Sequence, residues 1–226
     1  NQTNQETIAA SGGITPLVNL LKEHSSDGAQ QTAAGAIAKL GEDATNRVTI
    51  AEEGAIPLLV ALFDGGSEDS MEQVELALQN LAIQNNKNQL AIAYRLVDKL
   101  KEGSIAAQEH VTRLIETLAQ DAENRGAIAK AGAVPELVRQ LEQGSEKAMG
   151  MAASGLALIA LKSAEHRATV TNELVKLLGS DNEAVRQRAS EALTDMAAHA
   201  EKPRKPSRPK PVATAAGARP GAQNAL

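Results

Sequence analysis

The stretch from Glu53 to Phe63 reads EGAIPLLVALF, and its order of Gly, small residue, apolar residue and Pro is typical of a sharp corner between two helices. Gly54 suits the left-handed backbone conformation that closes a helix. Pro57 suits the first turn of a new helix, where its missing N–H costs nothing. The apolar run is too short to cross a membrane, which takes roughly 20 residues. We therefore expect one helix to end near Glu53 and another to begin near Pro57.

The same corner occurs elsewhere in the chain and defines a repeat. SGGITPLVNLLK spans residues 11–22, AGAVPELVRQLE spans residues 131–142, and weaker copies read YRLVDKLKEGS and NELVKLLGSDN. One leucine of each copy aligns, giving Leu17, Leu59, Leu96, Leu137 and Leu174 at spacings of 42, 37, 41 and 37. A second series of small-apolar helical segments has anchors at Leu40, Leu81, Leu118, Leu161 and Met196, with spacings of 41, 37, 43 and 35. A shared period of about 40 residues indicates a solenoid of stacked helical units.

Composition supports helices and excludes several kinds of site. The 226 residues include one Phe, one Tyr, no Trp and no Cys. Few aromatics argue against an all-β fold, and abundant Ala and Leu favour helices. The absence of Cys excludes disulfides, thiolate nucleophiles and Cys-based zinc sites. We find no membrane-spanning run or signal peptide and expect an intracellular protein, with an organelle also open because residue 1 is Asn rather than Met.

The repeat resembles a known family. The pattern N-x-x-x-I-A-x-x-G-A/G-I/V-P-x-L-V-x-L-L, followed by a long Ala/Leu helix ending in N-L-A, resembles the armadillo repeat over residues 4 to about 200. The resemblance implies an all-α, right-handed superhelical solenoid of stacked three-helix repeats. Its units would be about 1–45, 46–84, 85–122, 123–164 and 165–200. The third unit lacks the Gly-Pro corner and the fifth runs directly into its second helix. We expect a shortened or merged first helix in both, with local irregularity of the superhelix.

Stacking of these units should bury one continuous core, because no single unit can cover its own apolar face. The Ala-rich third helices should approach one another closely. The expected core residues are Leu17, Val18, Ile37, Leu40, Leu59, Val60, Leu81, Leu137, Val138, Leu161, Leu174 and Leu178.

The resemblance also implies that the third helices line a concave groove for extended peptides or partner helices. In armadillo proteins a polar residue near the end of the third helix often clamps a bound peptide, and Asn suits this because its amide both donates and accepts. The matching positions are Lys39, Asn80, Thr117, Ala160 and Asp195, so only Asn80 keeps the family Asn. Asn80 is open to interpretation as a clamp or as a solvated surface residue. The candidate groove residues are Lys39, Gln79, Asn80, Arg113, Thr117, Arg188 and Asp195.

Charge divides the chain into an acidic body and a basic tail. The net charge is −5, and residues 201–226 hold six bases and one acid, which leaves −10 for residues 1–200. The tail is rich in Pro and Ala, cannot form a packed core, and should be extended or disordered unless a partner binds it. It could be a solvated tether, a nuclear-localisation-like patch, or a strand that docks on an acidic surface of this chain or a partner. The docking bases would be Lys202, Arg204, Lys205, Arg208 and Lys210.

Nothing in the sequence has the spacing of a catalytic or metal site. The four histidines (His24, His110, His166 and His199) form no metal-binding spacing, and neither Gly-Gly pair precedes a Gly-Lys-Ser/Thr motif. We therefore expect a non-enzymatic protein-interaction scaffold or structural subunit of a larger complex, with no cofactor or metal. The resemblance offers an importin-α-like cargo adaptor as the alternative, although such adaptors pair their Asn ladder with a row of Trp. An RNA-binding solenoid is disfavoured because an acidic body repels phosphates.

Overall fold

The computed structural model describes residues 2–22 and 25–200, and this part of the chain contains helices and no strands. His24 and the five docking bases of residues 201–226 lie outside the described residues. In chain order the elements are α1 Gln2–Ala10, α2 Ile14–Asn19, α3 Asp27–Leu40, α4 Ala44–Glu52, α5 Ala55–Ala61, η1 Leu62–Asp64, α6 Glu68–Ala82, α7 Asn86–Glu102, α8 Ile105–Gln120, α9 Ala122–Lys130, α10 Ala133–Gln143, α11 Glu146–Ala160, α12 Ala164–Leu177 and α13 Glu183–Ala200.

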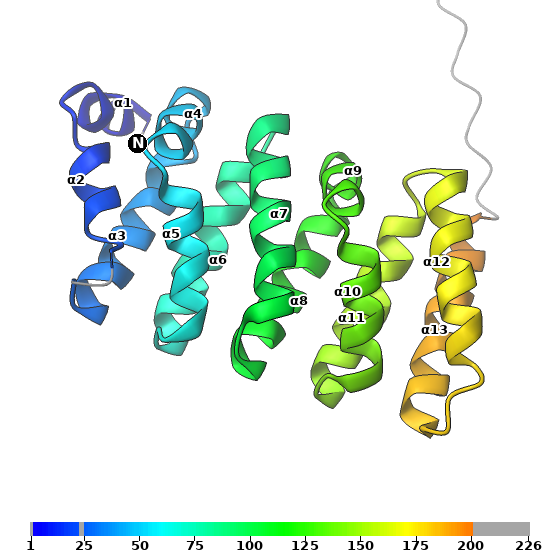
Figure 1. Ribbon diagram of the computed structural model, residues 1–226. Coiled ribbons are helices and arrows are strands. Elements are labelled where there is room, and N and C mark those ends of the chain that lie inside the picture. Colours follow the sequence, from blue (N-terminus) through cyan, green and yellow to red (C-terminus); the bar gives the residue numbers. More distant parts are fainter. Residues whose placement is uncertain (1, 23–24, 201–226) are drawn as a thin grey trace, which may run out of the picture.

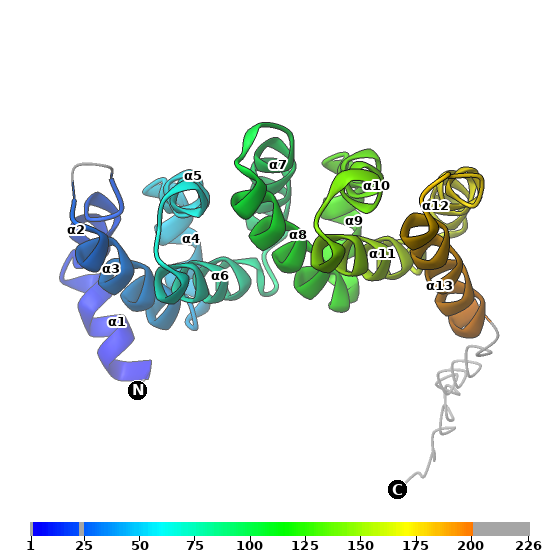
Figure 2. The ribbon, with the colours of Figure 1, turned by 90° about the horizontal axis from the view of Figure 1, so that it is seen from below.

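The helices stack side by side in chain order and form an armadillo-type solenoid (Figure 1). Figure 2 shows the third helices α3, α6, α8, α11 and α13 along one side of the row. The second helices α2, α5, α7, α10 and α12 lie along the other side. The buried apolar side chains form a single cluster that extends from Ile14 in α2 to Met196 in α13. One core therefore runs through the whole stack, as a solenoid requires.

The predicted corner at Gly54 is confirmed. Helix α4 ends at Glu52, Gly54 has a left-handed φ of 83°, and α5 begins at Ala55. Pro57 is therefore the third residue of α5, within the first turn as expected. Gly12 and Gly132 at the corresponding corners have φ values of 76° and 87°. A side chain would be strained at these three positions.

The merged helices expected in the third and fifth units are present as α7 and α12. Each is one continuous helix where other units have two helices and a corner. The third helices also pack unevenly. Helices α3 and α6, α8 and α11, and α11 and α13 pack along much of their lengths, whereas α6 and α8 contact each other at few positions.

Most of the predicted core residues are buried, but two predictions need correction. Leu178 is wrong: it is 41% exposed, because no described helix packs beyond α12 at that point. Leu161 is only half-buried and lies just after α11, whereas Ile159 is fully buried. Leu17 and Val138 are partly buried and pack against the core.

The correct anchor of the fourth unit is therefore Ile159. The buried positions Val111, Ile115 and Leu118 of α8 recur 41 residues later in α11 as Ala152, Leu156 and Ile159. With this change the anchors Leu40, Leu81, Leu118, Ile159 and Met196 are spaced by 41, 37, 41 and 37. The sequence alignment missed this because apolar residues fill both positions in SGLALIAL.

Asparagines at the starts of three first helices (or, in α7, the merged helix) attach each unit to the one before it. Asn88 Nδ2 donates to the carbonyls of Leu81 at 3.0 Å and Arg47 at 3.1 Å. Asn46 Nδ2 donates to the carbonyl of Leu40 at 3.2 Å, and Asn124 Nδ2 to that of Leu118 at 3.1 Å. All three side chains are buried. They satisfy carbonyls at the ends of the preceding third helices, which have no partner inside their own helix.

Candidate protein-binding surface

The predicted groove residues lie on four of the five third helices, and none of them lies on α11. We call the exposed side of α3, α6, α8, α11 and α13 the third-helix face. Lys39 comes from α3, Gln79 and Asn80 from α6, Arg113 and Thr117 from α8, and Arg188 and Asp195 from α13. These residues therefore follow one another along the solenoid, which is the arrangement that an extended partner would contact.

Asn80 uses its amide donor within the chain. Its Nδ2 donates to the carbonyl of Ala38 at 2.9 Å, and the side chain is half-buried. Asn80 thus joins α6 to α3, and one of its donors is already engaged before any partner arrives. With the corrected alignment, the residue of the fourth unit that is equivalent to Asn80 is Leu158. Ala160, the position predicted from sequence, is fully buried. The family's asparagine ladder is therefore reduced to one residue here.

The cations on this face are paired with acids. Each of four basic side chains has a carboxylate oxygen within 3.2 Å of a nitrogen. The pairs are Lys39 with Glu42 at 3.2 Å, Arg113 with Glu75 at 2.7 Å, Lys147 with Glu109 at 3.0 Å, and Arg188 with Glu191 at 2.9 Å. These four cations are locally neutralised and contribute little positive potential.

Hydrogen bonds stabilise the charged form of two of these carboxylates. The Ser145 hydroxyl, followed by the Lys147 ammonium, lowers the pKa of Glu109 below its ordinary value. The Gln187 amide and Arg188 lower the pKa of Glu191 in the same way. Both carboxylates therefore remain ionised at neutral pH, as stabilisation of the charged form requires.

Arg113 is the predicted groove residue most deeply engaged in packing. Its guanidinium donates to Glu75 through Nε at 3.2 Å and Nη2 at 2.7 Å, across from α8 to α6. His110 Nδ1 lies 2.9 Å from the same Nη2, and the His110 ring stacks on Phe63 with centroids 6.2 Å apart. Arg113 therefore bridges α8 and α6.

The remaining charge on the third-helix face is negative. Asp69 and Glu72 on α6 and Asp195 on α13 are exposed and form no ion pair with another described residue. Leu76 and Ile83, which are 36% and 42% exposed, add apolar surface from α6 and its end. Such a face suits a partner that offers cations together with some apolar contact.

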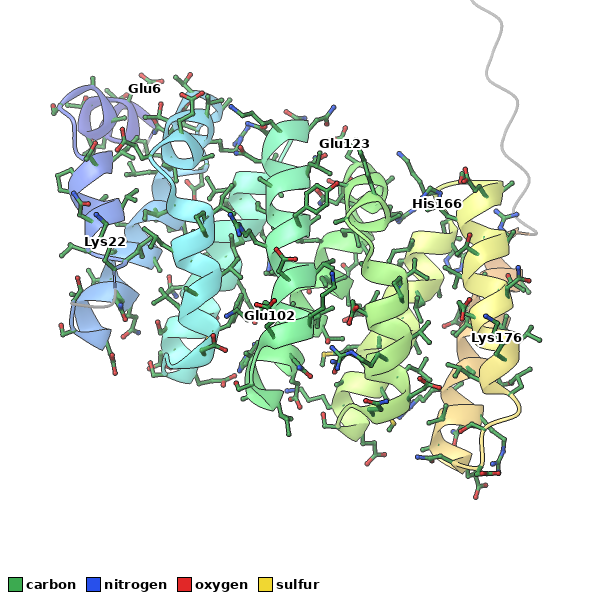
Figure 3. The ribbon with its side chains drawn as sticks, in the orientation of Figure 1. Glu6, Lys22, Glu102, Glu123, His166 and Lys176 are labelled. Atoms are coloured by element: carbon green, nitrogen blue, oxygen red, sulfur yellow. The ribbon has the colours of Figure 1, made fainter. Side chains whose placement is uncertain are left out.

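The opposite face is of mixed charge. Figure 3 shows Lys22, Glu102 and Lys176 at the ends of α2, α7 and α12, and Glu6, Glu123 and His166 along the upper edge.

Within residues 2–22 and 25–200, no cluster of three or more His, Asp or Glu could hold a metal ion. In the same ranges no helix combines the length and the apolar character needed to span a bilayer.

Comparison with known proteins gives consistent similarities. The family model described as Armadillo/beta-catenin-like repeat matches residues 1–40. A search of the curated proteins found no match. The solved "Designed armadillo repeat protein YIII(Dq)4CqI" is 27% identical with a TM-score of 0.53, covering 87% of each chain.

Two further similar solved structures are of designed armadillo repeat proteins, one in complex with a peptide and one designed for peptide recognition. "Designed armadillo repeat protein YIII(Dq.V1)4CPAF in complex with peptide (KR)4" is 26% identical with a TM-score of 0.56, and 87% of each chain is covered. "Crystal structure of computationally designed armadillo repeat proteins for modular peptide recognition" is 27% identical with a TM-score of 0.54, covering 84% of this chain and 85% of that one.

Proposed function

We propose that this armadillo-type solenoid, which is similar to designed armadillo repeat proteins, is a non-enzymatic protein-interaction scaffold that holds an extended basic segment of a partner along its third-helix face. The observation that carries this proposal is the charge of that face. Its cations Lys39, Arg113, Lys147 and Arg188 are each paired with an acid, while Asp69, Glu72 and Asp195 are exposed without an ion pair among the described residues.

Two further points support a basic partner. Residues 1–200 carry a net charge of −10, which attracts cationic segments over long range. A similar solved protein is described as a complex with the peptide (KR)4. The five-unit division of residues 1–200 is part of the proposal, since it sets how many repeats a bound segment would cross.

The test is binding of a fluorescent peptide of alternating Lys and Arg, measured by anisotropy with the full chain. The charge reversals Glu72→Lys and Asp195→Lys together should weaken binding at least about tenfold, because they replace attraction by repulsion at two units. Raising the salt concentration should also weaken binding. A peptide of alternating Glu and Gly serves as the charge control and should not bind.

The matched control variant is Glu102→Lys, which makes the same charge change on the opposite face at the end of α7. It should leave the affinity within about twofold of the parent, apart from a small long-range effect. If Glu102→Lys weakens binding as much per charge as the third-helix variants, the partner recognises net charge and not this face. That result would reject the proposal.

The cargo-adaptor alternative remains a second candidate because of the similar (KR)4 complex. It predicts reversible binding of many basic peptides with little sequence preference. The chain has no Trp, and the one ladder asparagine, Asn80, already donates to Ala38. For these reasons we favour a scaffold with a dedicated partner, and a broad preference across basic peptides of different sequence would favour the adaptor.

The docking bases Lys202, Arg204, Lys205, Arg208 and Lys210 could occupy the same face. Removal of residues 201–226 should then raise the affinity for the Lys/Arg peptide. An unchanged affinity would instead support the tether interpretation of these residues.

A further inference from the structure

A histidine lies inside the charged contact between α6 and α8. His110 Nδ1 is 2.9 Å from Nη2 of Arg113 and 3.5 Å from Oε1 of Glu75. The other ring nitrogen, Nε2, is 3.6 Å from Oε2 of Glu68. The ring of His110 therefore has a guanidinium and a carboxylate at one nitrogen and a second carboxylate at the other.

The contact with Arg113 fixes the protonation state of this ring. A guanidinium has hydrogen-bond donors and no acceptor, so His110 Nδ1 must accept the bond and carries no proton. His110 is therefore neutral in this arrangement, and its one ring proton is on Nε2, which faces Glu68. Histidine changes its charge between about pH 5 and 8. In acid, a second proton would be added at Nδ1, where Arg113 now donates.

A proton at Nδ1 is incompatible with this contact, because two donors would then face each other across 2.9 Å. Arg113 is the partner that can move. The ring of His110 stacks on the buried Phe63, and its side chain is only 16% exposed. The side chain of Arg113 is 31% exposed, and its long stem lets the guanidinium turn to water.

The carboxylates are placed to accept the protons of a charged ring. We propose that protonation of His110 transfers Glu75 from Arg113 to His110 and leaves the Arg113 guanidinium free on the third-helix face. The protonated ring then has Glu75 at Nδ1 and Glu68 at Nε2, and both carboxylates stabilise its charge. Arg113 Nη2 is also 3.9 Å from Oε1 of Glu68, but Glu68 is exposed and such a pair contributes little.

The other charges of α6 favour the same change. Asp69 and Glu72 lie between Glu68 and Glu75 in the sequence, and both are exposed without an ion pair among the described residues. Arg113 is the cation that opposes these four acids at the ring. Once its guanidinium turns away, the surroundings of His110 are negative and favour the charged form of the ring.

Charged groups on the other neighbouring elements are already paired or distant. Asp64 of η1 pairs with Lys99 of α7, and Glu109 of α8 pairs with Lys147 of α11. The charged residues of α9 follow Gln120, which is about three helical turns from His110. The α6 acids and Arg113 therefore decide which charge the ring prefers.

This switch would regulate the site of the basic partner, a consequence that rests on the proposed function. At neutral pH the guanidinium of Arg113 is neutralised by Glu75 at 2.7 Å. In acid, the third-helix face gains the charge of His110 and an unpaired guanidinium. A basic segment should therefore bind less tightly as the pH falls through the range in which histidine ionises.

The switch itself is tested without a partner, by NMR of the full chain labelled with nitrogen-15. The Nε–H signal of Arg113 is identified by its loss in Arg113→Ser, and the ring signals of His110 by their loss in His110→Gln. Between about pH 7.5 and about pH 5.5, both sets of signals should shift with one midpoint. The proposal is overturned if the Arg113 signal stays unchanged while the ring takes up its proton, or if the ring stays neutral throughout.

The regulation is tested with the fluorescent Lys/Arg peptide over the same pH range. The dissociation constant of the parent should rise at least about threefold more than that of His110→Gln, which offers Arg113 an acceptor but cannot be protonated. A merely structural role of His110 would change the affinity equally at every pH. His199→Gln is the control, because His199 is exposed near the end of α13, and it should keep the pH dependence of the parent.

The outcomes separate this switch from the proposed function. Equal loss of affinity in the parent and in His110→Gln overturns the regulation, and so does loss of the pH dependence in His199→Gln. If the peptide binds at no pH, the proposed function fails, and the Arg113 signal still decides whether the switch exists. Circular-dichroism melting curves of the variants show whether each is folded, and the titration of the parent needs no variant fold.

Discussion

Adjacent third helices meet differently at the α8–α11 and α6–α8 junctions. At the first, Gly155 lies over Glu116, and an added Cβ at Gly155 would be 3.8 Å from the Glu116 Cα atom. Ser154 Oγ donates to Glu116 at 2.9 Å across the same contact. At the α6–α8 junction the position equivalent to Gly155 is Leu114, which is fully buried, and the two helices touch at few places.

Two repeat positions explain this difference. One position faces the preceding unit. It holds a small residue in three units (Ala77, Gly155 and Ala192) and a large one, Leu114, in α8. The position that faces the following unit is Ala34, Thr112 or Ala153 elsewhere but Glu75 on α6. A large apolar side chain and a carboxylate together hold α8 away from α6. Residue size at two positions thus sets the separation between third helices.

The largest expected change in stability comes from a substitution that makes the close α8–α11 junction resemble the open α6–α8 junction. Gly155→Leu should destabilise the fold by about 2–3 kcal/mol, because the added atoms must displace Leu137 or the α8 backbone. Gly155→Ala is the control. It meets its nearest neighbours at ordinary contact distances and should stabilise α11 by about 0.5–1 kcal/mol. Urea unfolding measures both, and equal destabilisation by Ala and Leu would show that helix separation is not the cause.

The next effect concerns the ion pair that fills the open junction. Arg113→Ser should cost about 2 kcal/mol, because it leaves Glu75, whose side chain is 13% exposed, without its cation. Glu75→Thr should cost less, since Arg113 is 31% exposed and its guanidinium can turn to water. The double variant should be more stable than Arg113→Ser alone, as a thermodynamic cycle would show. The comparison fails if Glu75→Thr is the more costly single change.

A third prediction concerns Asn88, whose side chain joins the second and third units, the two units whose third helices α6 and α8 lie apart. Asn88→Ala should cost about 1.5 kcal/mol, because it removes two hydrogen bonds between units and leaves the carbonyl of Leu81, near the end of α6, without its donor. Asn124→Ala is the matched variant and should cost less, near 0.5–1 kcal/mol. Asn124 forms one such bond, and its buried Oδ1 has no hydrogen-bond partner among the described residues. Thermal unfolding of both variants would reveal whether the order is reversed.

Much of this architecture could be predicted from local sequence. The corner at Gly54 follows from the presence of Gly and Pro, and the merged helices α7 and α12 follow from their absence, because the backbone preferences of these residues act within a few residues. Periodicity indicated a solenoid of helical units, and the armadillo architecture was implied by the resemblance of the repeat pattern to that family. The misplaced anchor at Leu161 arose because periodicity alone cannot select between neighbouring apolar positions, and only contact with other units buries Ile159 completely.

The candidate surface could be predicted less fully. The family resemblance placed residues such as Asn80 and Arg113 on the third helices, but it gave no sign that both would be engaged with the preceding unit. Those partners, Ala38 and Glu75, lie 42 and 38 residues away in sequence and become neighbours only when the units stack. The ion pairs that neutralise the cations of the third-helix face, and hence the net charge of that face, could not be predicted for the same reason. The bridging role of Asn88 was missed for this reason too.

The smallest expected effect is a pH-dependent change in stability at the close α8–α11 junction. The lowered pKa of Glu109 means that its contacts with Ser145 and Lys147 add stability above the ordinary Glu range near about 4.3, and this stability is lost as the pH falls through the lowered value. Glu109→Gln should therefore cost a few tenths of a kcal/mol near neutral pH, consistent with a solvent-exposed pair, and the difference should shrink in acid. Glu102→Gln, an exposed carboxylate on the opposite face, controls for the loss of charge. Melting temperatures across a pH series decide the outcome: a gap between parent and Glu109→Gln that widens as the pH falls would mean that the carboxylate opposes the close α8–α11 contact instead of supporting it.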